Sequence, residues 1–243
     1  MGLLDGKVAI ITGAGTGIGR GIAKAYSREG AKIVLASRNR VNLERTAQEL
    51  RADGGTALVL PTDVTIEEQV IDMVRKTVDE YGRLDIMVSN SGIFDGGPFE
   101  ELTLETWRKV IDVNLTGVFL CGREAMKVMR RQGEGRIINI GSISAQMPRA
   151  GSAPYTATKH ALVGLTKTMA LEGREFGVVT SILHPGNVDK ESRVGSTDPA
   201  DHEPMMQPED IAAAALTMAA LPPNVNMLES IVLPTAQLYL GRG

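Results

Sequence analysis

The chain has 243 residues, and its 26 lysines and arginines against 29 aspartates and glutamates give a formal net charge of −3 at pH 7. This balance provides no general attraction for nucleic-acid phosphates or anionic lipids, so neither is an expected partner. The hydrophobic fraction of 43% is that of an ordinary folded protein. A single cysteine excludes an internal disulfide, and the three histidines show no metal-binding spacing, so no metal site is predicted.

Nothing in the sequence predicts export or membrane insertion. The first residues lack a basic segment followed by a long apolar run, and the longest apolar stretch, residues 211–221, is too short to span a bilayer. We therefore expect a cytoplasmic protein with no membrane partner.

Short β-branched runs alternate with longer helical patterns along the chain, which is typical of parallel strands joined by crossover helices. The expected strands are 8–12, 32–36, 56–60, 84–89, 136–140, 178–183 and 227–233. The expected helices are 17–29, 41–52, 66–81, 104–131, 155–172 and 208–221. The predicted fold is therefore α/β: a single doubly wound, Rossmann-type domain over residues 1–243, with a seven-stranded, mainly parallel sheet and helices on both faces.

One segment departs from this alternation. Residues 187–206 are poor in periodicity and rich in Gly, Pro, Asp and Ser, which predicts a lid over the substrate.

A glycine-rich segment, 12–23, follows the first predicted strand and leads directly into an amphipathic helix. Gly13, Gly17 and Gly19 have the spacing G-x-x-x-G-x-G rather than the strict G-x-G-x-x-G. Glycines let a phosphate approach the backbone, and the helix N-terminus supplies free N–H groups and partial positive charge. This context favours a dinucleotide-phosphate site over a glycine-rich turn without function.

The end of the second predicted strand indicates which dinucleotide binds. An acid at this point accepts the ribose hydroxyls of NAD, whereas a cation faces the 2′-phosphate of NADP. The chain has no acid here, and Arg38 can bind a phosphate through two N–H groups while Ser37 donates its hydroxyl. NADP(H) is therefore favoured. If Arg38 and Arg40 are only a solvated helix start, NAD(H) is possible instead.

Asp63 follows the third predicted strand and is placed to meet the adenine amino group. Its alternative role is to cap the helix that begins near Thr65.

Tyr155 and Lys159 are four residues apart in a predicted helix, so they share one face. A phenol titrates near ~10, and a neighbouring cation favours the phenolate, which brings the pKa of Tyr155 toward physiological pH. Tyr155 can then exchange a proton with a substrate oxygen.

Ser142 and Asn114 are candidates for the same site. Ser142 ends a predicted strand and so lies at the carboxyl edge of the sheet, where ligands bind in open parallel sheets. Asn114 is a polar residue in an otherwise apolar helical stretch, which indicates either a core hydrogen bond or part of a proton relay.

In order and spacing, these motifs resemble the short-chain dehydrogenase/reductase family from Lys7 to about Gly186. The matching segments are TGAGTGIG at 12–19, DVT at 63–65, NSG at 90–92, VNLTG around Asn114, Ser142, YTATK at 155–159 and PG at 185–186.

The resemblance implies that Tyr155 is the acid–base group and that Lys159 lowers its pKa and holds the nicotinamide ribose. It also implies that Ser142 orients the substrate oxygen, that Asn114 anchors a relay water and that Asn90 flanks the cofactor. The expected cofactor-binding residues are Gly13, Gly15, Thr16, Gly17, Ile18, Gly19, Ser37, Arg38, Asp63, Val64, Asn90, Gly92, Tyr155, Lys159, Pro185, Gly186 and Val188.

The chain departs from the family at two places. Lys190 stands where relatives have a Thr that contacts the nicotinamide amide, and the Val188 backbone is the alternative contact. The last strand lacks the Asp-Gly-Gly of many relatives, and its Pro-Thr-x-Gln ending resembles broad-specificity hydroxy-acid and carbonyl dehydrogenases.

The substrate pocket is expected between residues 92–99, 144–152 and 187–206. Phe94, Met147, Met205 and Met206 suggest an apolar lining, whereas Arg149 and Lys190 are able to bind a carboxylate. His160 and His184 have no partner that the sequence identifies, so both are interpreted as structural.

The sequence thus predicts an oxidoreductase that transfers hydride between NADP(H) and a ketone or secondary alcohol. The alternative is an NADP-binding sensor or scaffold protein without catalysis. The resemblance also implies a homotetramer or dimer that packs the helices at 104–131 and 155–172.

Overall fold

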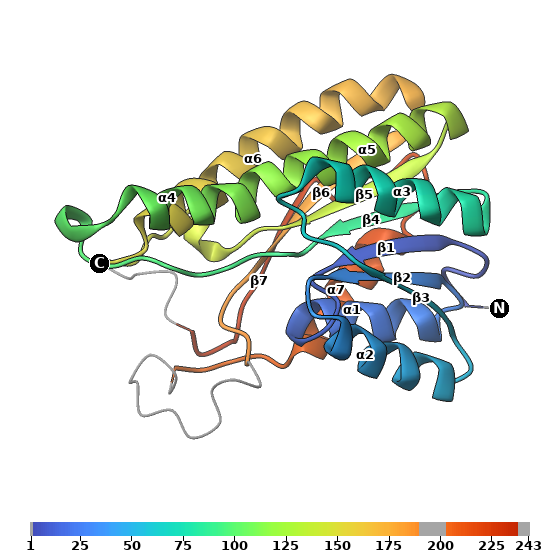
Figure 1. Cartoon of the computed structure of the whole chain (residues 1–243), viewed down its shortest axis with the longest axis horizontal. Helices are drawn as coiled ribbons and strands as arrows, with labels where there is room; N and C mark the ends of the chain where they lie inside the picture. The colour runs from blue at the N-terminus through green and yellow to red at the C-terminus, as the bar shows by residue number, and fades with distance from the viewer. Residues whose placement is uncertain (1, 190–202, 238–243) are drawn as a thin grey trace.

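The computed structural model describes residues 2–189 and 203–237. Seven strands form one sheet in the order β3-β2-β1-β4-β5-β6-β7, and every neighbouring pair is parallel (Figure 1). The strands are β1 Val8–Thr12, β2 Lys32–Ser37, β3 Thr56–Pro61, β4 Ile86–Ser89, β5 Gly135–Ile140, β6 Val178–Pro185 and β7 Glu229–Val232. The predicted doubly wound α/β sheet is confirmed.

Helices cover both faces of the sheet (Figure 1). One face carries α1 Gly17–Arg28, α2 Arg40–Ala52 and α7 Pro208–Ala220. The other carries α3 Glu67–Tyr81, α4 Leu104–Ile111, α5 Gly117–Gln132 and α6 Ala153–Gly173. Alternate residues of β1 face the two layers: Ala9 and Ile11 pack in the core with α1, α2 and α7, and Ile10 packs in the core with α3 and α5.

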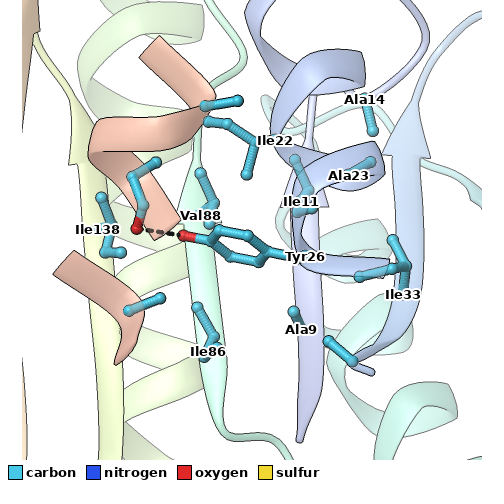
Figure 2. Close-up of a cluster of buried hydrophobic side chains, with 14 of the residues drawn as sticks. Ala9, Ile11, Ala14, Ile22, Ala23, Tyr26, Ile33, Ile86, Val88 and Ile138 are labelled. Atoms are coloured by element: carbon cyan, nitrogen blue, oxygen red, sulfur yellow. Dashed lines mark hydrogen bonds between the residues drawn. The ribbon is translucent and has the colours of Figure 1, made fainter. Parts of the chain in front are cut away.

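The helix that follows the glycine-rich loop, α1, is packed on the sheet through Tyr26. The Tyr26 ring lies among aliphatic side chains of β1, β2, β4 and β5 (Figure 2). Its hydroxyl donates a 2.9 Å hydrogen bond to the Ala215 carbonyl of α7. Burial raises the pKa of Tyr26 far above its ordinary value, so the phenol stays neutral. This bond ties α1 to α7.

The predicted helix 104–131 is interrupted. A π-helical turn, Asp112–Thr116, separates α4 from α5 and contains Asn114. The backbone continues in helical conformation on both sides of the turn, so the apolar pattern of the sequence runs through it.

In residues 2–189 and 203–237, no helix is both long and apolar enough to cross a membrane. Within the same residues, the His, Cys, Asp and Glu side chains form no group of three suited to a metal ion.

Candidate active site

The strand order changes direction between β1 and β4, and ligands of open parallel sheets bind at the carboxyl edge beside such a point. Thr12 ends β1 and Ser89 ends β4, so the glycine-rich loop and residues 90–92 leave this edge side by side. The predicted site residues are therefore distributed along one edge of the sheet.

The glycine-rich loop has the backbone that a phosphate site requires. Gly13 and Gly17 have φ values of +65° and +51°, which side chains other than glycine rarely adopt. A Cβ at Gly19 would collide with the Gly13 carbonyl oxygen, and one at Gly13 would lie 2.7 Å from Asn90 Nδ2. Thr16 precedes α1, and no side chain caps its N-terminus. The loop therefore fits the pyrophosphate of a dinucleotide.

Asn90 stabilises the start of this loop through hydrogen bonds. Its Nδ2 donates to the Thr12 carbonyl at 2.9 Å and to the Gly13 carbonyl at 3.4 Å. Its backbone N–H and that of Ser91 donate to Thr12 Oγ1 at 2.9 and 3.0 Å. Asn90 thus holds the first turn of the loop, in addition to its predicted place beside the cofactor.

Ser37 and Arg38 lie at the same edge of the sheet, at the end of β2, the strand beside β1. Thr12 pairs with Ala36 in the sheet, so Arg38 follows two residues after the partner of Thr12. The Arg38 side chain is exposed, and Asn39 caps α2 by accepting a 3.0 Å bond from the Asn42 N–H. Arg40 lies 3.6 Å from Glu44. Arg38 and Arg40 both face solvent here, and Arg40 is the one with a carboxylate neighbour among the described residues.

The alternative role of Asp63, capping the next helix, is wrong, because Ile66 is the N-cap residue of α3 and no described side chain makes a cap bond there. The Asp63 carboxylate instead bonds within the turn that precedes α3. Its Oδ1 accepts from the Thr65 N–H at 3.0 Å and from Thr65 Oγ1 at 2.7 Å. These bonds shape the turn before α3, which begins at Glu67. Val64 is buried beside this turn. The adenine role of Asp63 stays a prediction.

Tyr155 lies in the first turn of α6, and Lys159 lies one turn later with its side chain buried. Lys159 Nζ donates a 2.8 Å hydrogen bond to the Ile140 carbonyl at the end of β5. The same ammonium is 5.4 Å from the centroid of the Tyr155 ring. Lys159 thus connects the acid–base candidate to the strand that leads to Ser142.

Ser142 is nearly buried, and its Oγ accepts a 3.1 Å bond from the Ser144 N–H at the start of the short helix Ile143–Ala145. Burial raises the pKa of Tyr155, and a hydrogen bond with the Ser142 side chain lowers it in part. The net direction is opposite to the one predicted, because desolvation of the phenol dominates. Burial also lowers the pKa of Lys159 to about 8.

The fully buried Asn114 uses both ends of its side-chain amide on one residue. Oδ1 accepts from the Ile93 N–H at 2.8 Å, and Nδ2 donates to the Ile93 carbonyl at 2.8 Å. The π-helical turn therefore fixes the segment after Gly92. Phe94, in that segment, is 61% exposed and packs on Tyr155 with ring centroids 5.2 Å apart.

The Pro185-Gly186 end of β6 is held by residues near the carboxyl terminus. The Gly186 N–H donates to the Val232 carbonyl at 2.7 Å, and the Asn187 N–H donates to Gln237 Oε1 at 2.9 Å. The sequence singled out the Pro-Thr-x-Gln ending but did not predict Gln237 as a support of this loop. Val188 is buried and forms an isolated bridge with Met206, while Lys190 lies outside the described residues.

Arg149 is predicted to be able to bind a substrate carboxylate. In the structure it already binds a carboxylate of the protein itself, that of Glu203. An Arg149 guanidinium N–H donates to Glu203 Oε2 at 2.7 Å and to Asn187 Oδ1 at 3.3 Å. Asn187 Nδ2 also donates to Glu203 Oε2, at 2.6 Å. The two ends of the predicted lid, near 187 and 203, therefore meet at Arg149.

The comparisons with known proteins agree with this architecture. A family model of short chain dehydrogenases matches residues 7–200. An uncharacterized oxidoreductase of Staphylococcus aureus is 36% identical over 96% of this chain and 100% of its own length. An uncharacterized oxidoreductase of Bacillus subtilis is 41% identical over 75% of this chain and 71% of its own length.

Solved structures of dehydrogenases superpose on this chain over almost its whole length. A dehydrogenase/reductase from Sinorhizobium meliloti superposes with a TM-score of 0.89 at 32% identity, covering 96% of each chain. A candidate gluconate dehydrogenase from Agrobacterium tumefaciens superposes with a TM-score of 0.88 at 33% identity, covering 94% of this chain and 95% of its own. The chain belongs to the short-chain dehydrogenase/reductase family, whose members are oxidoreductases that bind a nicotinamide cofactor.

Proposed function

We propose that this protein transfers hydride between NADP(H) and a ketone or secondary alcohol. The observation that carries the proposal is the arrangement of Ser142, Tyr155 and Lys159 at one sheet edge. The Ser142 side chain is near enough to Tyr155 to lower its pKa. Lys159 Nζ donates to the Ile140 carbonyl, two residues before Ser142, and lies over the Tyr155 ring. Because the Ser142 and Tyr155 hydroxyls lie close together, both can bind the same substrate oxygen.

The proton step follows from these groups. In reduction, the Tyr155 hydroxyl gives its proton to the substrate oxygen while the Ser142 hydroxyl donates a hydrogen bond to it. Burial favours the neutral phenol, so Tyr155 carries this proton at neutral pH. In oxidation, the phenolate takes the proton of the alcohol. The Lys159 ammonium favours this charged form.

Asn114 supports the site through its backbone as well as its side chain. The side-chain amide is bonded at both ends to Ile93, so the backbone carbonyl is the group we assign to a relay water. The π-helical turn accommodates this role, because such turns leave carbonyls without the regular helical partner.

The cofactor, when bound, supplies the hydride. The glycine-rich loop would hold the pyrophosphate on the free N–H groups that open α1. Asp63 and Val64 would lie toward the adenine, and Ser37 and Arg38 toward the 2′-phosphate. On the nicotinamide side we assign Asn90, Gly92, Pro185, Gly186 and Val188.

The preference for NADP(H) is tested by fluorescence titration with NADPH and NADH. Arg38→Ala should abolish most of the NADPH preference, because a guanidinium bound to phosphate contributes more than one in water. Arg40→Ala is the matched control, since Arg40 pairs with Glu44. Equal binding of both cofactors to the unaltered protein would contradict the assignment and favour NAD(H).

The substrate site is proposed between Phe94, Met147 and the segment 187–206, which we assign as the lid of a single domain. The Val188–Met206 bridge supports this assignment, because it closes the base of the segment. Ketones, secondary alcohols and hydroxy acids, gluconate among them, should be screened. One substrate should give turnover that Tyr155→Phe removes. Tight NADPH binding with no turnover on any substrate would support the sensor or scaffold alternative.

We also propose a cytoplasmic homo-oligomer, a dimer or tetramer, that packs α5 and α6 against a second copy. Phe119 of α5 is 44% exposed and Leu171 of α6 is 61% exposed, which supports an interface on these helices. Sedimentation equilibrium measures the number of copies. A monomer at micromolar concentration would contradict this part of the proposal.

A further inference from the structure

His184 lies in β6 with its side chain fully buried, directly beside the backbone of Ser142. The Ser142 N–H donates to His184 Nδ1 at 3.1 Å, and the Ser142 carbonyl oxygen is 2.9 Å from the same nitrogen. One ring nitrogen therefore contacts both polar backbone groups of the residue that carries the candidate substrate-orienting hydroxyl.

The ring also fills the space beside the residue before Ser142. A Cβ at Gly141 would lie 2.7 Å from His184 Cε1, so only glycine lets the imidazole approach the backbone here. The Gly141 N–H donates to the Leu183 carbonyl at 2.7 Å. Together with the bond from Lys159 to the Ile140 carbonyl, these contacts hold three consecutive residues from two sides.

The other ring nitrogen faces a carboxylate. His184 Nε2 lies 3.3 Å from Glu229 Oε1 of β7, and Glu229 Oε2 lies 3.3 Å from Lys167 Nζ of α6. Among the described residues, Nε2 is buried and makes no hydrogen bond of good geometry. A row of groups thus runs from Lys167 through Glu229 and His184 to the backbone of Ser142.

We propose that His184 is a positioning residue for the reaction proposed above: its imidazole fixes the Ser142 backbone so that the Ser142 and Tyr155 hydroxyls face one substrate oxygen, and Glu229 fixes the ring. The inference rests on the proposed function. It assigns no contact between His184 and the substrate.

Nδ1 lies within hydrogen-bond distance of both the Ser142 N–H and the Ser142 carbonyl oxygen, so its contacts are compatible with either tautomer. We assign the hydrogen to Nε2, because the Glu229 carboxylate faces that nitrogen, and this leaves the Nδ1 lone pair for the Ser142 N–H. Burial lowers the pKa of His184, and the Lys159 charge lowers it further. The Glu229 charge and the hydrogen bond with the Ser142 backbone raise it, but the pKa is lowered overall. The imidazole is therefore neutral at pH 7.

Three variants of the whole protein test the proposal. Asn at position 184 places a polar atom where Nδ1 lies, whereas Gln places one near Nε2. His184→Asn should keep kcat within about threefold, and His184→Gln should lower kcat by about 10- to 100-fold with KM and the NADPH dissociation constant almost unchanged. His160→Asn is the matched control, because His160 is exposed and its Nδ1 lies 3.0 Å from the Thr156 carbonyl oxygen of its own helix.

A double-variant cycle separates positioning from a general effect on the fold. If His184 acts through Ser142, the His184→Gln loss should nearly vanish in a Ser142→Ala background. Losses that add fully in the double variant would overturn the proposal, as would an unchanged kcat in His184→Gln. Equal losses in the Asn and Gln variants would also overturn it.

A measurement independent of turnover distinguishes this inference from the proposed function. In ¹⁵N spectra of histidine-labelled protein, His184 should show a neutral ring with hydrogen on Nε2 from pH 6 to 8. Hydrogen on Nδ1, or protonation near the ordinary ~6.5, would overturn the proposal. If the labelled ring behaves as expected and no substrate gives turnover, the proposed function fails while the buried contact to Ser142 stands.

Discussion

The Lys159 ammonium lies over the Tyr155 ring, 5.4 Å from its centroid, and its hydrogen bond goes to the Ile140 carbonyl at 2.8 Å rather than to the phenol oxygen. The cation therefore contacts the face of the Tyr155 ring while it anchors the end of β5. This arrangement explains why burial dominates the pKa of Tyr155 and why removal of Lys159 should disturb both the proton step and the strand end.

The stability of the protein should depend on Lys159 above neutral pH. Its pKa is about 8 in the folded protein and about 10.5 in the unfolded chain. Between these values the unfolded chain binds the extra proton, so the free energy of unfolding rises with pH, in total by roughly 3 kcal/mol. Below pH 8 both states are protonated, and Lys159 contributes no further slope.

Urea unfolding of the unaltered protein and of Lys159→Met from pH 7 to 10.5 checks this expectation. Lys24→Met, at a lysine that pairs with Glu49 on the surface, is the control and should keep the rise. An equal rise in Lys159→Met would contradict the assignment of the slope to this side chain.

The two directions of the reaction should respond differently to pH. Burial raises the pKa of Tyr155, so the neutral phenol that reduction needs persists through neutral and mildly alkaline pH. Oxidation needs the phenolate and should accelerate as pH rises. We expect kcat/KM for reduction to be flat from pH 6 to 8 and that for oxidation to increase over the same range. Reduction that falls between pH 6 and 8 would show that the pKa of Tyr155 is lowered instead.

Periodicity in the sequence was sufficient to predict the sheet, because the central strands are apolar on both faces and helices such as α1 and α3 have one clear apolar stripe. It could not reveal the π-helical turn at 112–116, because one extra residue in a helical turn leaves the apolar pattern almost unchanged. The motifs placed Ser142, Tyr155 and Lys159 at one edge.

Contacts between side chains that are far apart in the sequence could not be predicted from it. His184 meets Ser142 and Glu229 only when β5, β6 and β7 align in register. Arg149 meets Glu203 only when the segments before α6 and before α7 come together. The pKa direction of Tyr155 was predicted wrongly for the same reason. Spacing identifies a neighbouring cation, whereas desolvation depends on everything that packs around the phenol.

Arg149 and Glu203 give a prediction about the substrate. Glu203 Oε2 occupies the guanidinium at 2.7 Å, so a substrate carboxylate that binds there has to displace it. Glu203→Gln removes this competition and should lower KM for a hydroxy-acid substrate by roughly two- to fivefold, the effect of one partly exposed ion pair. KM for a neutral alcohol on the same variant is the control. If both values change equally, Glu203 acts on the lid and not on the charge of the substrate.

The bond between Tyr26 and the Ala215 carbonyl gives a prediction about stability. Tyr26→Phe keeps the ring in the core of Figure 2 and removes only the 2.9 Å hydrogen bond to α7. The free energy of unfolding should fall by about 1 kcal/mol, which for a chain of this length lowers Tm by about 2–4 °C.

Tyr81→Phe is the matched control, because no bond of the Tyr81 hydroxyl to the described residues is present and its ring lies 5.3 Å from Lys32 Nζ. Differential scanning calorimetry should show no change in that variant. NADPH affinity is the second measurement, since α1 follows directly from the glycine-rich loop. A Tyr26→Phe protein with unchanged Tm would show that the Ala215 carbonyl gains an equally good partner when the hydroxyl is removed, and that the aliphatic contacts alone hold α1 on α7.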